Sequence, residues 1–156
     1  MNESDTRAAA VPVAAGLFEQ DGESVHLLGS LCRGCGRQYF PRTPDCRNPA
    51  CVRKELDPIR LPRRGTLYSY TVQAYRPPAP FRRDDWAPYA IGLVDLPGGL
   101  RVMGIVGDCA LDDIYIGMDL EVGACPLYHD ASGHQVLTYR FSPPRPGGPG
   151  AQAAQR

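Results

Sequence analysis

The chain has 156 residues, of which 43% are hydrophobic and 22% charged, so it has room for one compact domain or two small ones and not for a large self-contained enzyme. Its 17 basic and 17 acidic residues balance, which leaves no overall positive field to hold nucleic acid. The 17 glycines and 16 prolines are too many for a helical protein and favour short strands joined by loops.

The sequence has no stretch of the roughly 20 apolar residues that a bilayer-spanning helix needs, and its N-terminus lacks the regions of a secretion signal. We therefore expect a cytoplasmic protein with no membrane contact. Six cysteines are present, and four of them form two pairs within 20 residues, while Cys109 and Cys125 stand alone. In a cytoplasmic chain this pairing favours a metal site over disulfides.

The two ends of the chain differ from its middle. Residues 1–16 are small and unpatterned, and residues 143–156 are rich in proline, glycine and alanine, so both are expected to be disordered arms. Between them we predict a zinc ribbon over residues 17–63 and a barrel over residues 64–142. Within the ribbon, apolar runs flank an Asp21-Gly22 turn, which predicts a short hairpin leading into the first cysteine pair.

The strongest chemical signal is a spacing of four cysteines, Cys32-x2-Cys35-x10-Cys46-x4-Cys51. Zinc prefers four thiolates at about 2.3 Å in a tetrahedron, and each pair supplies two sulfurs from one turn. Gly34 and Gly36 suit the first turn because glycine permits positive φ. We predict a structural zinc site; iron in a rubredoxin-like site would use the same ligands. A closed shell of four sulfurs leaves no position for water, so catalysis at this metal is not expected.

Basic charge is concentrated around these cysteines. Residues 32–64 carry nine basic residues against three acids, whereas residues 65–156 carry seven arginines against nine acids. Four thiolates and a dication together contribute about −2, which cancels part of the basic charge. The predicted barrel segment is therefore slightly acidic.

After Pro62 the pattern changes to five apolar runs of strand length, at residues 66–75, 89–96, 100–108, 119–129 and 135–141. Five strands with turn signals between them predict a small barrel. Residues 110–114 are compatible with one helical turn before the fourth run. The fold class is therefore expected to be mainly β.

The one long connection, residues 76–88, carries the only tryptophan, Trp86, and four prolines. Long loops with aromatic residues are often binding segments; the alternative is a stiffened flap in which Trp86 covers the barrel end. Arg82 and Arg83 in this loop are candidates for contacting phosphates.

No catalytic constellation accompanies these features. The three histidines, His26, His129 and His134, are not adjacent to a cysteine or to a serine motif, and neither glycine-rich phosphate-binding pattern occurs. Cys109 is better explained as a loop cysteine without a function than as a nucleophile. We expect no catalytic residues in this chain.

Three blocks of sequence carry a family resemblance: residues 64–72 (RGTLYSYTV), 87–96 (APYAIGLVDL) and 116–122 (IGMDLEV). With the cysteine spacing before them, they make residues 25–142 resemble the acyl-CoA-associated zinc-ribbon/OB-fold family. That resemblance implies a rubredoxin-like zinc ribbon followed by a five-stranded OB-fold barrel, with the four cysteines as the metal ligands.

Members of that family are mostly non-catalytic partners of thiolase-fold proteins. The resemblance therefore implies a subunit of a hetero-oligomeric enzyme that transfers acyl groups between a 3-ketoacyl thioester and CoA. Within the family, a stand-alone chain of this size looks most like the zinc-finger subunits of benzoylsuccinyl-CoA thiolases. Partners of retro-aldol lyases acting on steroid side-chain acyl-CoA, and of archaeal acetoacetyl-CoA-forming complexes, are the alternatives.

Two readings from other classes stay open at this point. Zinc ribbons and OB-folds also bind single-stranded nucleic acid, and Tyr68, Tyr70 and Tyr75 on one predicted strand are candidates for stacking on bases. The alternation of a strand would place Tyr68 and Tyr70 on one face, where they could equally pack the barrel. Against binding nucleic acid stand the neutral total charge and the acidic barrel segment. The other reading is a free-standing electron carrier with iron at the four sulfurs.

Overall fold

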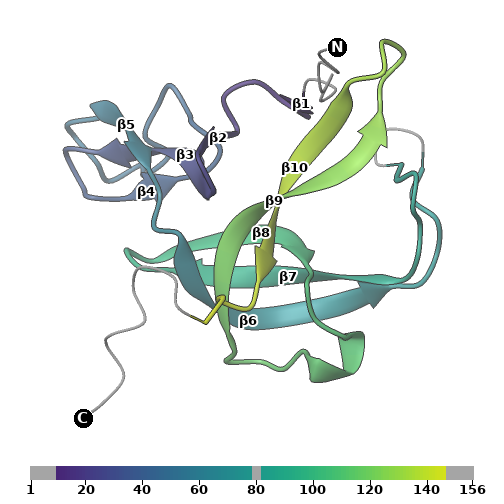
Figure 1. The fold of residues 1–156 in the computed structure, drawn as a ribbon. Helices are drawn as coiled ribbons and strands as arrows, with labels where there is room; N and C mark the ends of the chain where they lie inside the picture. Colours follow the sequence, from purple (N-terminus) through teal and green to yellow (C-terminus); the bar gives the residue numbers. More distant parts are fainter. Residues whose placement is uncertain (1–9, 79–81, 147–156) are drawn as a thin grey trace.

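The computed structural model describes residues 10–78 and 82–146, and this part of the chain is built from strands with one short 3-10 helix, η2 (Leu111–Asp113) (Figure 1). The expected mainly β fold class is confirmed. The first half contributes β1 (Ala10–Pro12), β2 (Phe18–Asp21), β3 (Ser24–Cys32), β4 (Gln38–Tyr39) and β5 (Leu56–Arg60). The second half contributes β6 (Arg64–Gln73), β7 (Tyr89–Leu96), β8 (Leu100–Val106), β9 (Asp119–His129) and β10 (Gln135–Ser142).

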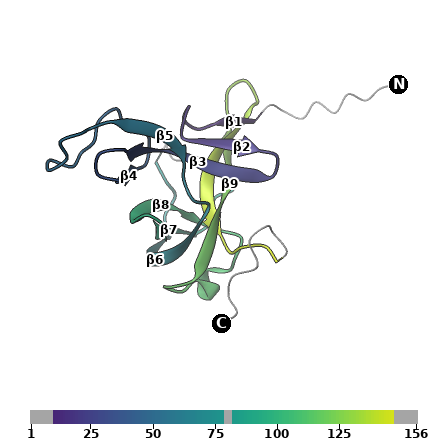
Figure 2. The ribbon, with the colours of Figure 1, turned by 90° about the vertical axis from the view of Figure 1, so that its left-hand side faces the viewer.

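The ribbon is a small antiparallel sheet in which β3 is the central strand. The predicted hairpin is present: β2 pairs with β3 around a turn in which Gly22 has φ +59°. The C-terminal half of β3 pairs with both β4 and β5, as Figure 2 shows. Strand β5 was not predicted, because its sequence LDPIR contains a proline and has no clear alternation.

The second half closes into a five-stranded barrel. Strand β6 pairs with β7, β7 with β8, β8 with β10, β10 with β9, and β9 returns to β6. The β8–β10 pairing is parallel, with Arg140 opposite Ile105, while the other four pairings are antiparallel. This closed order is that of an OB-fold.

Strand β7 shows why these residues form a barrel wall. Every second residue of YAIGLVDL is buried, which is the period of a strand with one face on the core. Gly92 is tightly packed, since a Cβ there would lie 2.7 Å from Leu67 and 2.8 Å from Val106. A larger residue would displace the core side chains that close the barrel.

Strand β6 does not keep a simple alternation, and the expectation that Tyr68 and Tyr70 share a face is wrong. The register with β7 shifts between Leu67 and Ser69, which inserts a bulge at Tyr68. Tyr70 lies opposite Gly92, on the core side of the wall. The ring of Tyr68 lies on the outer side, under the guanidinium of Arg101.

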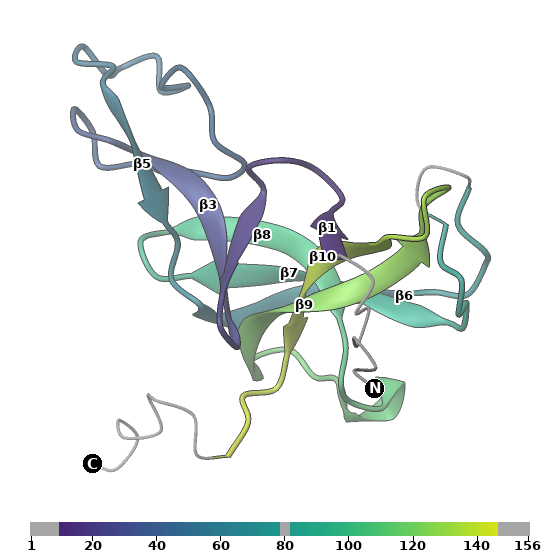
Figure 3. The ribbon, with the colours of Figure 1, turned by 45° about the horizontal axis from the view of Figure 1, so that its top comes forward.

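The ribbon and the barrel share one hydrophobic core. Leu27 of β3 and Leu61 after β5 are buried in the same cluster as Leu120 and Phe141 of the barrel. Main-chain bonds run through the junction: Leu61 N–H donates to the Leu27 carbonyl at 2.9 Å, and Val122 N–H donates to the Arg63 carbonyl at 2.8 Å. Figure 3 shows β3 lying alongside β9 at this junction.

The N-terminal arm differs from its prediction. Residues 10–12 form β1, which pairs in parallel with β10 so that Val11 lies opposite Val136, and Val13 N–H donates to the Leu137 carbonyl. A segment of three residues is too short to show a periodicity in the sequence. It becomes a strand because β8 pairs with β10 only at Arg140 and Phe141, so the N-terminal part of β10 remains free to pair with β1. Residues 1–9 and 147–156 of the predicted arms lie outside the described residues.

Candidate metal centre

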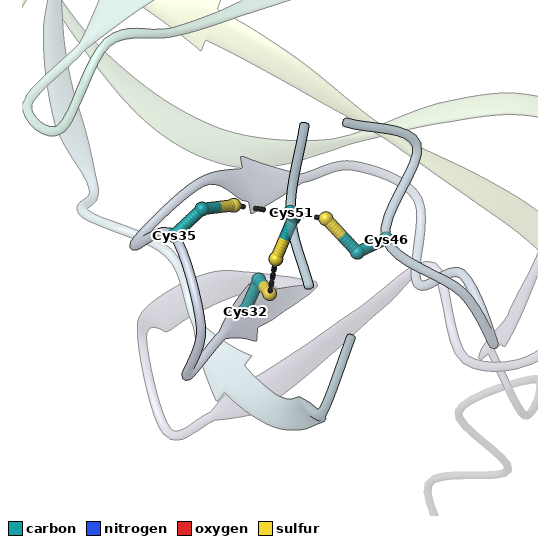
Figure 4. A group of neighbouring side chains, drawn as sticks. All are labelled: Cys32, Cys35, Cys46 and Cys51. Carbon is teal, nitrogen blue, oxygen red and sulfur yellow. Dashed lines mark hydrogen bonds between the residues drawn. The ribbon is translucent and has the colours of Figure 1, made fainter. Parts of the chain in front are cut away.

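The four cysteines converge at the tip of the ribbon, as Figure 4 shows. Their sulfurs all lie within 4.8 Å of one another. The Cys32 and Cys51 sulfurs are 3.7 Å apart, and those of Cys35 and Cys46 are 3.6 Å apart. A tetrahedron with metal–sulfur bonds of about 2.3 Å has sulfur–sulfur edges of about 3.8 Å. The cluster therefore has the size of a zinc tetrathiolate site.

Tight turns place these sulfurs. In the first, Gly36 has φ +71° and its N–H donates to the Cys32 carbonyl at 2.8 Å. Gly34 is required for another reason, because a Cβ there would lie 1.9 Å from the Arg53 carbonyl oxygen. In the second, wider turn, Asn48 accepts two hydrogen bonds of 3.1 Å. Its backbone carbonyl accepts the Cys51 N–H, and its side-chain oxygen accepts the Ala50 N–H. This side-chain turn folds the four residues between Cys46 and Cys51 so that both sulfurs reach the cluster.

The thiols of the cluster ionise differently. The Tyr39 hydroxyl, 3.2 Å from the Cys46 sulfur, and then the Asn48 amide lower the pKa of Cys46 to about 6, although burial opposes them. Burial, together with the neighbouring cysteines, raises the pKa of Cys51 to about 12. The Arg37 amide lowers the pKa of Cys35. The Cys46 thiol thus ionises readily, whereas the Cys51 thiol ionises only when a bound cation stabilises its thiolate. A structural zinc ion fits this donor set.

Tyr39 is the residue of this site that sequence reasoning missed. Its hydroxyl contacts the Cys46 sulfur and also accepts the Arg47 N–H at 3.1 Å. Tyr39 lies seven residues before Cys46, in a two-residue strand, and no motif marks it. Only the pairing of β4 with β3 places its ring beside the cluster.

Local acids neutralise much of the basic charge around the cluster. Arg33 pairs with Asp57, and Arg53 pairs with Glu55 at 2.8 Å. Arg60 pairs with Glu19 of β2. Part of the basic charge seen in the sequence is therefore balanced within the ribbon.

The long loop lies at the opposite end of the molecule from the ribbon (Figure 1), so the structure does not bring Arg82 and Arg83 near the cysteines. The Arg82 guanidinium lies 4.6 Å from the centre of the Tyr128 ring, and that of Arg83 lies 5.1 Å from the Tyr89 ring. Neither has a carboxylate in ion-pair distance among the described residues. Trp86 donates from its ring nitrogen to the Tyr75 carbonyl at 3.2 Å, which joins the two ends of the loop.

Asp84 fixes this loop to β9. Its carboxylate accepts the His129 N–H at 3.0 Å and lies 3.2 Å from His129 Nδ1. These two contacts hold the pKa of Asp84 below its ordinary value of 3.8. The contact is therefore present at neutral pH and is lost as the pH falls through that lowered pKa. His134 makes a similar contact with Asp130, and His26 lies opposite Glu19 in the hairpin.

The outer face of β7 and β8 is the surface on which OB-folds commonly bind ligands. Its centre is apolar and consists of Ile91, Leu93, Met103 and Ile105. Arg101, the one arginine within β7 and β8, makes two hydrogen bonds to Asp95, at 2.6 and 3.0 Å, and covers Tyr68. Its charge is thus balanced within the face. In the part of the chain that the structure describes, no helix has the length and apolarity to cross a membrane.

A ribbon with four clustered sulfurs in front of a closed barrel of this strand order defines a zinc-ribbon/OB-fold protein. Two family descriptions match in the same order: the "ChsH2, rubredoxin-like zinc ribbon domain" covers residues 21–57, and the "ChsH2, C-terminal OB-fold domain" covers residues 59–124. The chain belongs to this family of zinc-ribbon/OB-fold proteins, also named after the DUF35 domain.

Three relatives illustrate the range of the family. A DUF35 domain-containing scaffold protein of Methanocaldococcus jannaschii is 36% identical over 75% of this chain and 81% of its own length. Benzoylsuccinyl-CoA thiolase subunit BbsA of Thauera aromatica is 31% identical over 78% of each chain. A solved structure titled "Ltp2-ChsH2(DUF35) aldolase" superposes with a TM-score of 0.56 at 27% identity, over 76% of this chain and 84% of that one. This chain thus shares its zinc-ribbon/OB-fold organisation with proteins that are named as a scaffold, a thiolase subunit and part of an aldolase.

Proposed function

We propose that this chain is the non-catalytic zinc-binding subunit of a thiolase-type acyl-CoA enzyme. A thiolase-fold partner carries out acyl transfer between a 3-ketoacyl thioester and CoA, and this chain supports its assembly or its acyl-CoA site. Cys32, Cys35, Cys46 and Cys51 hold a structural zinc ion. The observation that carries the proposal is the similarity to a benzoylsuccinyl-CoA thiolase subunit across nearly the whole described fold, so thiolysis of benzoylsuccinyl-CoA is the first reaction to test.

The chemistry follows a simple division of labour. Thiolysis needs a cysteine nucleophile and acid–base groups beside the thioester. Of the two cysteines outside the cluster, Cys125 is buried, and burial raises the pKa of both Cys109 and Cys125. Neither is an activated nucleophile. The partner supplies these groups.

A second candidate is a subunit of a lyase that cleaves a steroid side-chain acyl-CoA by a retro-aldol reaction. The similarity to a structure titled as an aldolase supports it. Binding of single-stranded nucleic acid is less well supported, because the centre of the outer face of β7 and β8 is apolar and Arg101, the one arginine within these two strands, is paired with Asp95.

The test of the proposal is co-expression with any thiolase-fold protein that is encoded beside this chain. We expect the two chains to co-purify, and we expect the partner to be inactive or insoluble without this chain. Benzoylsuccinyl-CoA with CoA, and a β-hydroxyacyl-CoA of a steroid side chain, distinguish thiolysis from retro-aldol cleavage. The proposal fails if the partner alone has the full kcat/KM of the mixture, or if this chain alone turns over either substrate.

Arg82 and Arg83 are proposed to contact CoA phosphates in this complex. A charge-assisted contact to a phosphate contributes about 1.5 to 3 kcal/mol, so the double replacement Arg82→Ala, Arg83→Ala should weaken CoA binding to the complex by about tenfold or more. Calorimetric titration with CoA and with 3′-dephospho-CoA shows which phosphate is contacted. Arg42→Ala, an exposed arginine of the ribbon, is the matched control. Unchanged CoA affinity in the double variant would remove the assignment.

A further inference from the structure

Exposed apolar side chains concentrate along β6 and the loop beside it. Of the nine large hydrophobic residues that are exposed among the described residues, six are found here: Tyr68, Tyr70, Val72, Tyr75, Tyr115 and Ile116. Tyr115 and Ile116 are 63% and 66% exposed. Such a concentration on one part of a surface marks an interaction site more often than scattered single residues do.

Hydrogen bonds hold the loop against the strand, so that these residues form one surface. The Tyr70 hydroxyl donates to the Ile114 carbonyl at 3.0 Å, and Gly117 N–H donates to the Leu67 carbonyl at 2.8 Å. Tyr68 projects on the outer side of the barrel wall, and Tyr70 and Val72 lie on its other side. The apolar surface therefore wraps around the edge of β6.

That edge is open over the second half of the strand. Strand β9 pairs with β6 only from Arg64 to Thr66, and the following loop bonds to it at Leu67. Strand β7 occupies the opposite edge as far as Gln73. From Tyr68 to Gln73, the described chain places no strand on the β9 side. Backbone N–H and C=O groups of alternate residues face outward there, ready to pair with another strand.

The exposed edge lacks the features that keep such edges from pairing. Its sequence, Tyr68 to Gln73 (YSYTVQ), contains no charged residue, no proline and no glycine. Natural proteins protect an edge that stays in solvent with lysines, prolines or inward-pointing charges. An unprotected edge flanked by apolar side chains is therefore expected to be covered when the protein works.

We infer that the open edge of β6, over residues 68–73 with Tyr75, Tyr115 and Ile116 beside it, is the docking surface for an extended, uncharged strand of the thiolase-fold partner. This inference rests on the proposed function. The occupant is a strand because the edge presents a row of hydrogen-bonding groups about 20 Å long, at about 3.3 Å per residue. It lacks charge because residues 68–73 of β6 offer no charged side chain to pair with one. The partner is chosen over a second copy because similar proteins are named as subunits of heteromeric enzymes.

A matched pair of valine-to-lysine variants tests the surface. Val72→Lys places a charge on the edge, where Val72 is 41% exposed, and Val52→Lys makes the same change at a fully exposed position in the ribbon. Immobilised thiolase-fold partner is the probe. We expect Val72→Lys to weaken binding by about tenfold or more, as at an interface centre, and Val52→Lys to bind as the wild type. Ile116→Lys tests the loop, and metal content with melting temperature shows that each variant is folded.

Amide hydrogen exchange supplies a second readout that does not depend on a variant. The edge amides of residues 68–73 should exchange fast in the isolated chain and become protected in the complex. Equal binding by Val72→Lys and Val52→Lys, without protection of the edge, refutes the docking surface and leaves the proposed function standing. A wild-type chain that does not bind the partner refutes both. Edge protection in the isolated chain, with dimers in sedimentation, identifies a second copy as the occupant and overturns the choice of partner.

Discussion

Replacing Cys51 with serine is expected to remove the bound zinc and unfold the tip of the ribbon. A serine oxygen does not substitute for a soft thiolate in a four-sulfur site. The remaining contacts there are few: β4 has two residues, and the described apolar side chains that pack against the cysteines, Tyr39 and Leu56, are only partly buried. Metal binding therefore replaces a hydrophobic core in this part of the chain.

Elemental analysis of the purified Cys51→Ser protein should find close to no zinc, against about one ion per wild-type chain. Amide exchange should show loss of protection in β4 and β5. Cys109→Ser is the matched control, because Cys109 lies in the loop before η2 and outside the cluster; it should keep both the zinc and the exchange pattern. A Cys51→Ser protein that retains a full complement of metal would contradict the assignment, and a coloured, redox-active wild type would identify iron in place of zinc.

Replacing Leu27 with alanine is expected to destabilise the ribbon and the barrel together. The Leu27 side chain is fully buried in the cluster that holds barrel residues such as Leu120 and Phe141. Removing a buried leucine side chain costs about 2 to 5 kcal/mol, because apolar burial is lost and a cavity remains. The cavity would lie at the junction, so both domains should lose stability in one transition.

Urea unfolding followed by tryptophan fluorescence and by zinc release measures this coupling. Trp86 reports on the barrel side and the metal on the ribbon, and both midpoints should fall by the same amount in Leu27→Ala. Val52→Ala serves as control, since Val52 is fully exposed and its replacement should leave both midpoints unchanged. Two separate transitions, with the barrel midpoint unmoved, would show that the two domains do not share a core.

Two of the control positions carry the same side chain as the tested position and differ from it only in their surroundings. Val52 and Val72 carry the same side chain, but Val52 lies at a fully exposed position of the ribbon and Val72 lies on the open strand edge. Cys51 and Cys109 likewise share a side chain and differ in surroundings. Each comparison therefore isolates the position from the chemistry of the substitution.

Local patterns in the sequence were sufficient for the regular parts of this protein. The four cysteines are identifiable from their spacing, and β7 from an apolar run of strand length that the structure confirms as a strand. The hairpin at Gly22 follows from turn chemistry. In each case the information lies within a few neighbouring residues, because a knuckle, a strand face or a tight turn is a short-range feature.

What the sequence alone determined is therefore a four-sulfur ribbon followed by five strands of barrel length. The tertiary structure decided the pairing of β1 with β10, the parallel contact of β8 with β10, the bulge that separates Tyr68 from Tyr70, and the Tyr39 hydroxyl beside Cys46. In the described residues, it also left the second half of β6 without a strand on its β9 side. These features depend on which edges remain open once the barrel closes, and closure joins residues distant in the chain, so no local pattern encodes them.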